Sequence, residues 1–167
     1  KLATTAKLTA SEKLVIQILQ KEVDRLNQFF NKKLGSAVDF SEEQSKLPKG
    51  DSLLGKKVAQ ALADWGFDQL KEMKIENVSK DHVLAFMNST SLRTTPHING
   101  DVTMGTIWDL IPFAGDVKLF ELTGMEALTL FENIRKWGQD RESKVFTPQI
   151  NFKPEALVAG EKYYLVL

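Results

Sequence analysis

The sequence predicts an α+β domain in which helices pack on a mixed β-sheet. Two long segments carry apolar residues at helical spacing, and several short segments are either continuously apolar or alternate like strands. At 167 residues the chain suits one compact domain with a helical extension. We divide it into an N-terminal lead-in helix, residues 1–35, and an α+β domain, residues 36–167, that we expect to be incomplete at its C-terminal end.

The first helix is predicted over residues 9–34, where apolar residues recur at helical spacing. Thr9 or Ser11 can cap it, and Glu12 follows Thr9 at the spacing of a capping box. Gly35 is the predicted C-cap.

A connector rich in polar residues is predicted over residues 36–51, and a second helix follows over residues 52–74. Asp51 or Ser52 would cap this helix, and Gly66 is a candidate break. Its apolar stripe includes Leu54, Val58, Leu62, Trp65 and Leu70.

Residues 83–87 form a short, continuously apolar run, which predicts a strand buried on both faces. A turn follows at residues 99–101, then a short extended piece and one or two helical turns at residues 105–110. Residues 116–122 alternate like a half-buried strand, and a helix is predicted over residues 125–137, ended by Gly138. The remainder, residues 145–167, is predicted to hold strands. Because the last of these strands runs into Leu167, we expect the natural sequence to continue.

The composition excludes several kinds of chemistry. The chain has no cysteine, and its two histidines, His82 and His97, are too few for a dinuclear metal centre; we expect both in solvent-exposed loops. Gly-x-Ser-x-Gly, Gly-x-Gly-x-x-Gly and Walker A motifs are absent, and the carboxylates are scattered. We therefore expect no catalytic and no metal-binding residue. Equal numbers of basic and acidic residues, 22 each, predict no nucleic-acid partner, and no apolar run is long enough to span a membrane.

Three residues between the predicted strand at 83–87 and Gly124 are candidates for binding a small molecule. Asn88 ends the strand, and its amide both donates and accepts hydrogen bonds. Arg93 follows on a loop, where a guanidinium can pair with two oxygens of a phosphate or carboxylate. Phe113, fixed after a proline, can offer its ring face to a planar base. By spacing alone, an ordinary surface arginine and a core phenylalanine explain the pattern better than a binding site does.

The order of short motifs adds a family resemblance. The C-terminal domain of the 5′-nucleotidase family shows Leu-Gly-Asn-x-Ile-Ala-Asp-Ala, Asn-Gly-Gly-x-Ile-Arg, Gly-x-Ile-Thr, Leu-Pro-Phe and Leu-x-Gly in this order. The chain resembles that domain through residues 54–61, Asn88-Ser-Thr-Ser-Leu-Arg93, Gly100-Asp-Val-Thr103, Ile111-Pro-Phe113 and Leu122-Thr-Gly124.

The resemblance implies a substrate-specificity domain. In the family, a separate metallophosphatase domain carries two metals and the catalytic histidine, so the chain is expected to be inactive alone. Divalent metals such as zinc or manganese are expected only in that domain. The resemblance further implies that Arg93 contacts a nucleotide phosphate, that Asn88 hydrogen-bonds the nucleoside, and that Phe113 forms one side of a base clamp. It also implies a periplasmic, extracellular or cell-surface location.

The chain departs from the family pattern at four places. Ser89-Thr90 replaces the two glycines after the asparagine, Lys56 replaces an asparagine, and Lys49 stands where an arginine is frequent. The second aromatic residue of the clamp would lie beyond Leu167. These departures motivate an alternative hypothesis: a stand-alone binding or interaction domain of the same fold that has lost nucleotide recognition.

Overall fold

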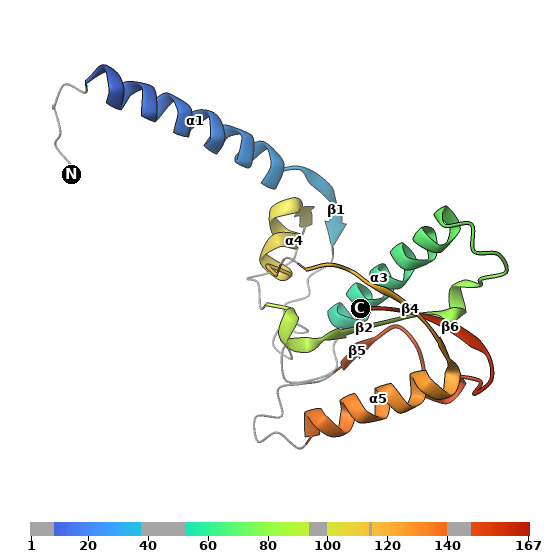
Figure 1. Ribbon diagram of the computed structural model, residues 1–167. Coiled ribbons are helices and arrows are strands. Elements are labelled where there is room, and N and C mark those ends of the chain that lie inside the picture. Colours follow the sequence, from blue (N-terminus) through green and yellow to red (C-terminus); the bar gives the residue numbers. More distant parts are fainter. Residues whose placement is uncertain (1–8, 38–52, 94–99, 114, 140–147) are drawn as a thin grey trace.

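The computed structural model describes residues 9–37, 53–93, 100–113, 115–139 and 148–167 (Figure 1). The predicted α+β class is confirmed. The helices are α1 (Ala10–Phe30), α3 (Leu53–Glu72), α4 (Met104–Leu110) and α5 (Gly124–Gln139), with short 3₁₀ turns η1 (Lys80–His82), η2 (Ser89–Ser91) and η3 (Pro154–Ala156). The strands are β1 (Lys33–Ala37), β2 (Val83–Asn88), β3 (Gly100–Thr103), β4 (Leu119–Thr123), β5 (Pro148–Ile150) and β6 (Lys162–Val166).

Four strands form a mixed sheet in the order β4-β6-β2-β5. β2 and β6 run parallel, while β4–β6 and β2–β5 are antiparallel. Because β2 lies inside the sheet and is covered on both faces, its side chains alternate between two cores. This explains why residues 83–87 form an unbroken apolar run.

Helix α3 covers one face of the sheet (Figure 1). Its small residues Ala59 and Ala63 are buried against Val83 and Val166, so the helix approaches the strands closely. The prediction that Gly66 breaks the helix is wrong, because α3 continues through this residue. Glycine at this position leaves room for the Val166 side chain, which would overlap a Cβ there. The predicted stripe is wrong at Trp65, which is 42% exposed, because the alanine and glycine positions face the sheet instead.

Helix α5 covers the opposite face, where Ala127 packs with Leu84, Tyr163 and Leu165. A capping box begins this helix: the Thr123 hydroxyl accepts from the backbone N–H of Glu126, and the Glu126 carboxylate accepts from the backbone N–H of Thr123 at 2.7 Å. The helix continues to Gln139, one residue beyond the predicted stop at Gly138.

A side chain continues the sheet where strand β5 ends. The Asn151 carboxamide oxygen accepts from the backbone N–H of Ala85 at 2.6 Å, and its nitrogen donates to the Val83 carbonyl at 3.0 Å. Asn151 thus supplies hydrogen-bond partners to backbone groups of β2 beyond the last pair with β5, Phe86 and Ile150.

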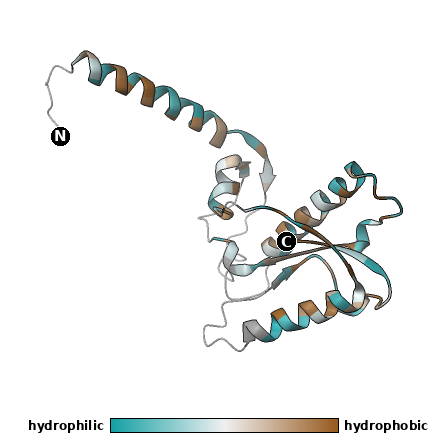
Figure 2. Cartoon of the chain, viewed as in Figure 1, coloured by the Kyte–Doolittle hydropathy of each residue, from teal (hydrophilic) through white to brown (hydrophobic). Residues whose placement is uncertain are grey.

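Helix α1 begins at the predicted capping box of Thr9 and Glu12, and it projects from the body of the molecule (Figure 2). The prediction that it reaches residue 34 is wrong, because it ends at Phe30 and the chain then pairs as strand β1 with β3. Ser36 and Ala37 likewise belong to β1 rather than to the predicted connector. Among the helices that the structure describes, none combines the length and apolar character needed to cross a bilayer.

His82 is not the solvent-exposed loop residue that the sequence suggested. It lies in η1, half-buried, with Nε2 3.4 Å from a Glu161 carboxylate oxygen and its ring centre 5.0 Å from that of Tyr163. Several other predictions concern residues outside the described ranges: His97, the caps Asp51 and Ser52, the position of Lys49, and the first residue of the turn, Asn99.

Candidate functional site

Two of the three candidate residues lie in direct contact. The guanidinium carbon of Arg93 lies 4.8 Å from the centre of the Phe113 ring, a cation–π arrangement. The backbone N–H of Arg93 donates to the Leu110 carbonyl at 2.8 Å, which ties the loop after η2 to the end of α4. Both side chains are exposed, Phe113 by 52%, so the pair offers solvent a cation beside an aromatic ring.

A small apolar core holds these two loops together. Leu54 of α3, Met87 of β2, Leu92 before Arg93, and Leu110 of α4 are all buried and pack as one cluster. Ile111, which precedes Pro112-Phe113, packs against it. The cluster therefore anchors the Arg93 loop through Leu92, the residue before Arg93. It anchors the segment that carries Phe113 through Ile111.

Asn88 is the last residue of β2 and is half-buried at the start of η2. It therefore enters the same loop that carries Arg93, five positions earlier in the chain. The next residue, Ser89, is fully buried, and its carbonyl accepts from the backbone N–H of Leu92 at 3.2 Å. Because the Ser89 side chain is enclosed, its hydroxyl does not project into the open corner where Arg93 and Phe113 lie.

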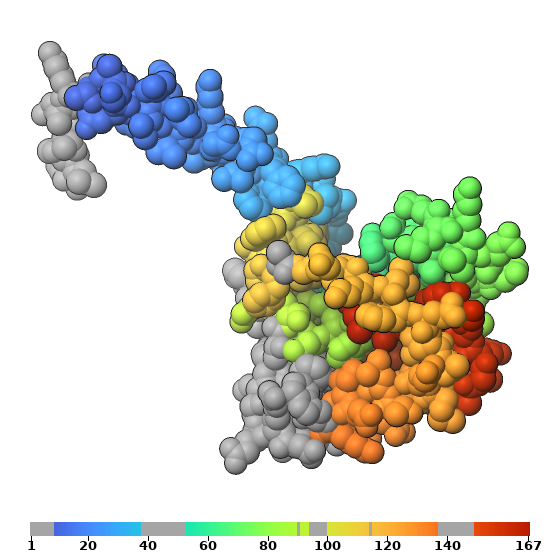
Figure 3. Space-filling view, viewed as in Figure 1, coloured from blue at the N-terminus to red at the C-terminus, as the bar shows by residue number. Residues whose placement is uncertain are grey.

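Helix α4 links this corner to α1. Phe30, the last residue of α1, packs edge-to-face on Trp108 of α4 with ring centres 5.8 Å apart. Strand β1 pairs with β3, and an ion pair between Lys33 and Asp101, 2.6 Å, crosses the two strands. In the space-filling view α1 leads away from this region, with α4 at its base (Figure 3).

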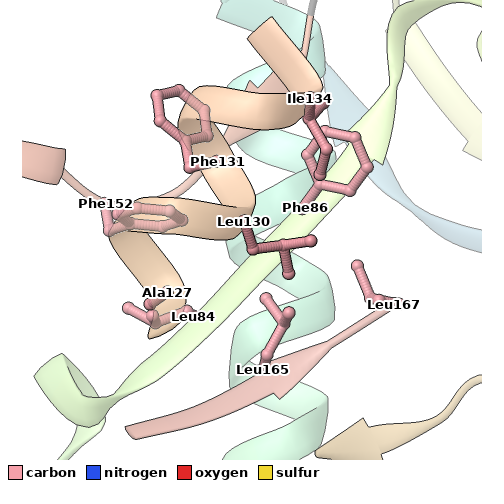
Figure 4. Close-up of a pocket in the computed structure, with 9 residues that line it drawn as sticks. All are labelled: Leu84, Phe86, Ala127, Leu130, Phe131, Ile134, Phe152, Leu165 and Leu167. Atoms are coloured by element: carbon pink, nitrogen blue, oxygen red, sulfur yellow. The ribbon is translucent and has the colours of Figure 1, made fainter. Parts of the chain in front are cut away.

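A hollow elsewhere in the domain has different chemistry. It is a small hollow between α5 and the sheet, and it is lined by apolar side chains (Figure 4). It is lined by Leu84, Phe86, Ala127, Leu130, Phe131, Ile134, Phe152, Leu165 and Leu167. Without polar groups to fix a phosphate or a sugar, this hollow does not suit a nucleotide, and none of the three candidate residues lines it.

The described residues gather no group of three or more His, Asp or Glu side chains that would hold a metal ion.

Sequence reasoning missed Gln149. This residue of β5 is fully buried, and its side chain lies against Gly55 in the first turn of α3. A buried carboxamide beneath the corner is a candidate for holding it in place. The only sequence signal was a glutamine within a predicted strand segment, which is too common to single out.

The fold and this corner define a mixed-sheet α+β module that presents an arginine stacked on a phenylalanine. The sequence profile of the family described as "5′-nucleotidase, C-terminal domain" matches residues 32–162. The chain therefore belongs to the 5′-nucleotidase C-terminal domain family, which confirms the resemblance seen in its motifs. No curated protein matches the chain at a significant level.

Solved structures show the same fold. A 5′-nucleotidase precursor from Thermus thermophilus superposes with a TM-score of 0.55 at 16% identity, covering 93% of this chain and 33% of that one. The Haemophilus influenzae NAD nucleotidase (NadN) gives 0.54 at 15% identity, covering 96% of this chain and 32% of that one. The chain thus spans about a third of the length of these proteins.

Proposed function

We propose that the chain is the substrate-specificity domain of a 5′-nucleotidase-like, metal-dependent phosphohydrolase. In this proposal Arg93 binds the nucleotide phosphate, Asn88 hydrogen-bonds the nucleoside and Phe113 stacks on the base. A separate metallophosphatase domain or chain, which carries the divalent metals, performs the hydrolysis. The observation that carries the proposal is the contact between Arg93 and Phe113, since these two side chains supply an anion-binding and a base-stacking group at one exposed corner.

The chemistry of the pair fits a nucleotide. A guanidinium recognises phosphate oxygens two at a time, and its stacking on an aromatic ring leaves its edge free to do so. The Phe113 ring has two faces, and Arg93 lies over one of them. A base would stack on the other face, and the half-buried Asn88 would add directional hydrogen bonds from the start of the same loop.

Calorimetric titration of the chain with AMP and with adenosine tests this proposal. We expect AMP to bind at roughly millimolar strength, about −4 kcal/mol. Arg93→Ala should abolish AMP binding and leave adenosine binding unchanged, because only AMP carries the phosphate. Arg135→Ala, an exposed arginine on α5, is the matched control and should change neither. Equal loss of AMP binding in the two variants would contradict the assignment of the phosphate to Arg93.

Helix α1 supplies the surface on which the metallophosphatase part would dock. Eight large apolar side chains of α1 are 44–58% exposed: Leu14, Val15, Ile16, Ile18, Leu19, Val23, Leu26 and Phe29. An apolar stripe of this extent marks a protein interaction surface. The helix precedes the family match at residues 32–162, and none of its residues is buried.

The docking role predicts a defined loss of function in trans. A metal-bearing partner chain of the same family, added to this chain, should hydrolyse AMP in a manner that depends on Arg93. Leu19→Ser together with Leu26→Ser should reduce this hydrolysis, whereas Gln28→Ser, a polar exposed position on the same helix, should not. Unchanged hydrolysis with the double variant would remove α1 from the interface.

The alternative, a stand-alone binding domain of the same fold that has lost nucleotide recognition, predicts no heat with AMP, adenosine, a nucleotide sugar or thiosulfate. The periplasmic, extracellular or cell-surface location belongs to the first proposal and is tested by fractionating cells that express the natural protein.

A further inference from the structure

Gln149 is a polar residue in an apolar setting. It is 0% exposed, and among the described residues no buried side-chain nitrogen or oxygen lacks a hydrogen-bond partner, as is usual for buried polar groups. In strand β5 it pairs with Met87 of β2, and paired residues of an antiparallel ladder point to the same face. That face is the one covered by α3.

The Gln149 side chain lies directly against the first turn of α3. A Cβ placed on Gly55 would lie 2.5 Å from Cδ and 2.6 Å from Cγ of Gln149, closer than any real contact. Glycine at position 55 therefore leaves room for the carboxamide, and the carboxamide in turn sets how closely the start of α3 approaches the sheet.

The preceding residue of α3 connects this contact to the candidate site. Leu54 packs with Met87, Leu92 and Leu110 in the apolar cluster below the corner. Leu92 precedes Arg93, and the Leu110 carbonyl receives the Arg93 backbone N–H. The position of the first turn of α3 is thus transmitted through packed side chains to the loop that carries Arg93 and to the end of α4.

We propose that Gln149 is a positioning residue for the Arg93–Phe113 pair. Its carboxamide packs against Gly55 and so fixes the position of the neighbouring Leu54. Leu54 in turn packs against Leu92 and Leu110, which lie beside Arg93 and at the end of α4. The effect expected on AMP binding rests on the proposed function. The effect expected on the contact between Arg93 and Phe113 does not depend on it.

The structural test is a ring-current measurement by NMR on the whole chain. Protons on the Arg93 side chain should resonate upfield in the wild type because they lie over the Phe113 ring, and Phe113→Leu calibrates the effect. Gln149→Leu, which replaces the carboxamide with a branched hydrocarbon, should lose most of this upfield shift. The control is Leu70→Val, a buried residue of α3 that lies about 24 Å along the helix axis from Leu54 at 1.5 Å per residue. It should keep the shift. A full upfield shift in Gln149→Leu, or an equal loss in Leu70→Val, overturns the proposal.

A pair of smaller changes keeps the proposal testable where Gln149→Leu does not fold. Gln149→Asn shortens the side chain by one methylene, and Gly55→Ala adds one methyl in the space beside it. Each change alone should reduce the upfield shift of Arg93, and the two together should recover it. If the upfield shift in the double variant is no larger than in the single variants, Gln149 does not act on the pair through its contact with Gly55.

The ligand readout separates this proposal from the proposed function. Where wild-type chain binds AMP, Gln149→Leu should weaken the affinity by at least about fivefold while Leu70→Val stays close to wild type, since a site needs a rigid supporting shell. Unaltered AMP affinity in Gln149→Leu overturns the positioning role. Absence of AMP binding in the wild type contradicts the proposed function, and the ring-current result then decides the role of Gln149 by itself.

Discussion

The guanidinium carbon of Arg93 lies 4.8 Å from the centre of the Phe113 ring, although the two residues come from separate loops. The contact is exposed, so its own free energy is small, about 0.5–1 kcal/mol. In the proposed function its contribution is geometric, because it holds the Arg93 guanidinium and the Phe113 ring face in one relation. The following predictions test this corner and the packing that supports it.

Arg93 and Phe113 should act together in binding AMP. Phe113→Leu removes the ring on which the guanidinium rests, so it should weaken AMP binding both by lost stacking and by a freer Arg93. In a double-mutant cycle with Arg93→Lys, measured by calorimetry, we expect a coupling free energy of about 0.5–1 kcal/mol. If the change in AMP binding free energy of the double variant equals the sum of the two single changes, the two residues contribute to binding independently.

Gly124→Ala should destabilise the domain by more than about 2 kcal/mol, since a strained core site has no room to relax. A Cβ at Gly124 would lie 2.8 Å from the Val158 carbonyl carbon and 3.0 Å from Cε2 of Tyr163. Gly115→Ala is the matched control, because no atom lies within 4 Å of a Cβ there. Urea unfolding followed by circular dichroism measures both, and similar midpoints for the two variants would refute the prediction.

Asn151→Ala should cost about 1–3 kcal/mol, because it leaves the backbone N–H of Ala85 and the carbonyl of Val83 unpaired at the edge of β2. Asn133→Ala, at an exposed position on α5, should change the stability by no more than about 0.5 kcal/mol. Thermal unfolding of the two variants beside the wild type gives the comparison. Hydrogen exchange at the Ala85 amide should accelerate in Asn151→Ala alone.

The capping box of α5 should make stability depend on pH in the acidic range. Hydrogen bonds from the backbone N–H and then the hydroxyl of Thr123 hold the pKa of Glu126 below its ordinary value of 4.5. A carboxylate with a lowered folded-state pKa contributes stability that is present above its unfolded pKa and is lost as the pH falls through the folded one. From about pH 6 to about pH 3 the wild type should therefore lose more stability than Glu126→Gln. Parallel curves for the two proteins would contradict the assignment.

Local signals predicted the parts of the structure that involve neighbours in the chain. Thr9 and Glu12 form the expected capping box because the bonded groups are three residues apart and need no other element. The apolar run at residues 83–87 is buried on both faces, as its composition indicates. The ordered motifs identified the family because they preserve the sequence of elements.

Local signals failed where a distant partner decided the outcome. Residues 33–37 form a strand because β3 lies beside them, although the apolar spacing continued the helix as far as Leu34. Trp65 is exposed because Ala59 and Ala63, not the larger residues, allow α3 to approach the sheet. His82 pairs with Glu161, which lies 79 positions away.

The order of residues was enough to predict the class of fold, the first helix cap and the family, and to name Asn88, Arg93 and Phe113 as candidates. The contact between Arg93 and Phe113, the tie between their loops through Leu110 and the burial of Gln149 under Gly55 emerged only in three dimensions. The physical reason is range. Caps and periodicities depend on hydrogen bonds and faces within one or two turns of chain, whereas the corner depends on side chains that only the packing of α3, β2 and α4 brings within reach.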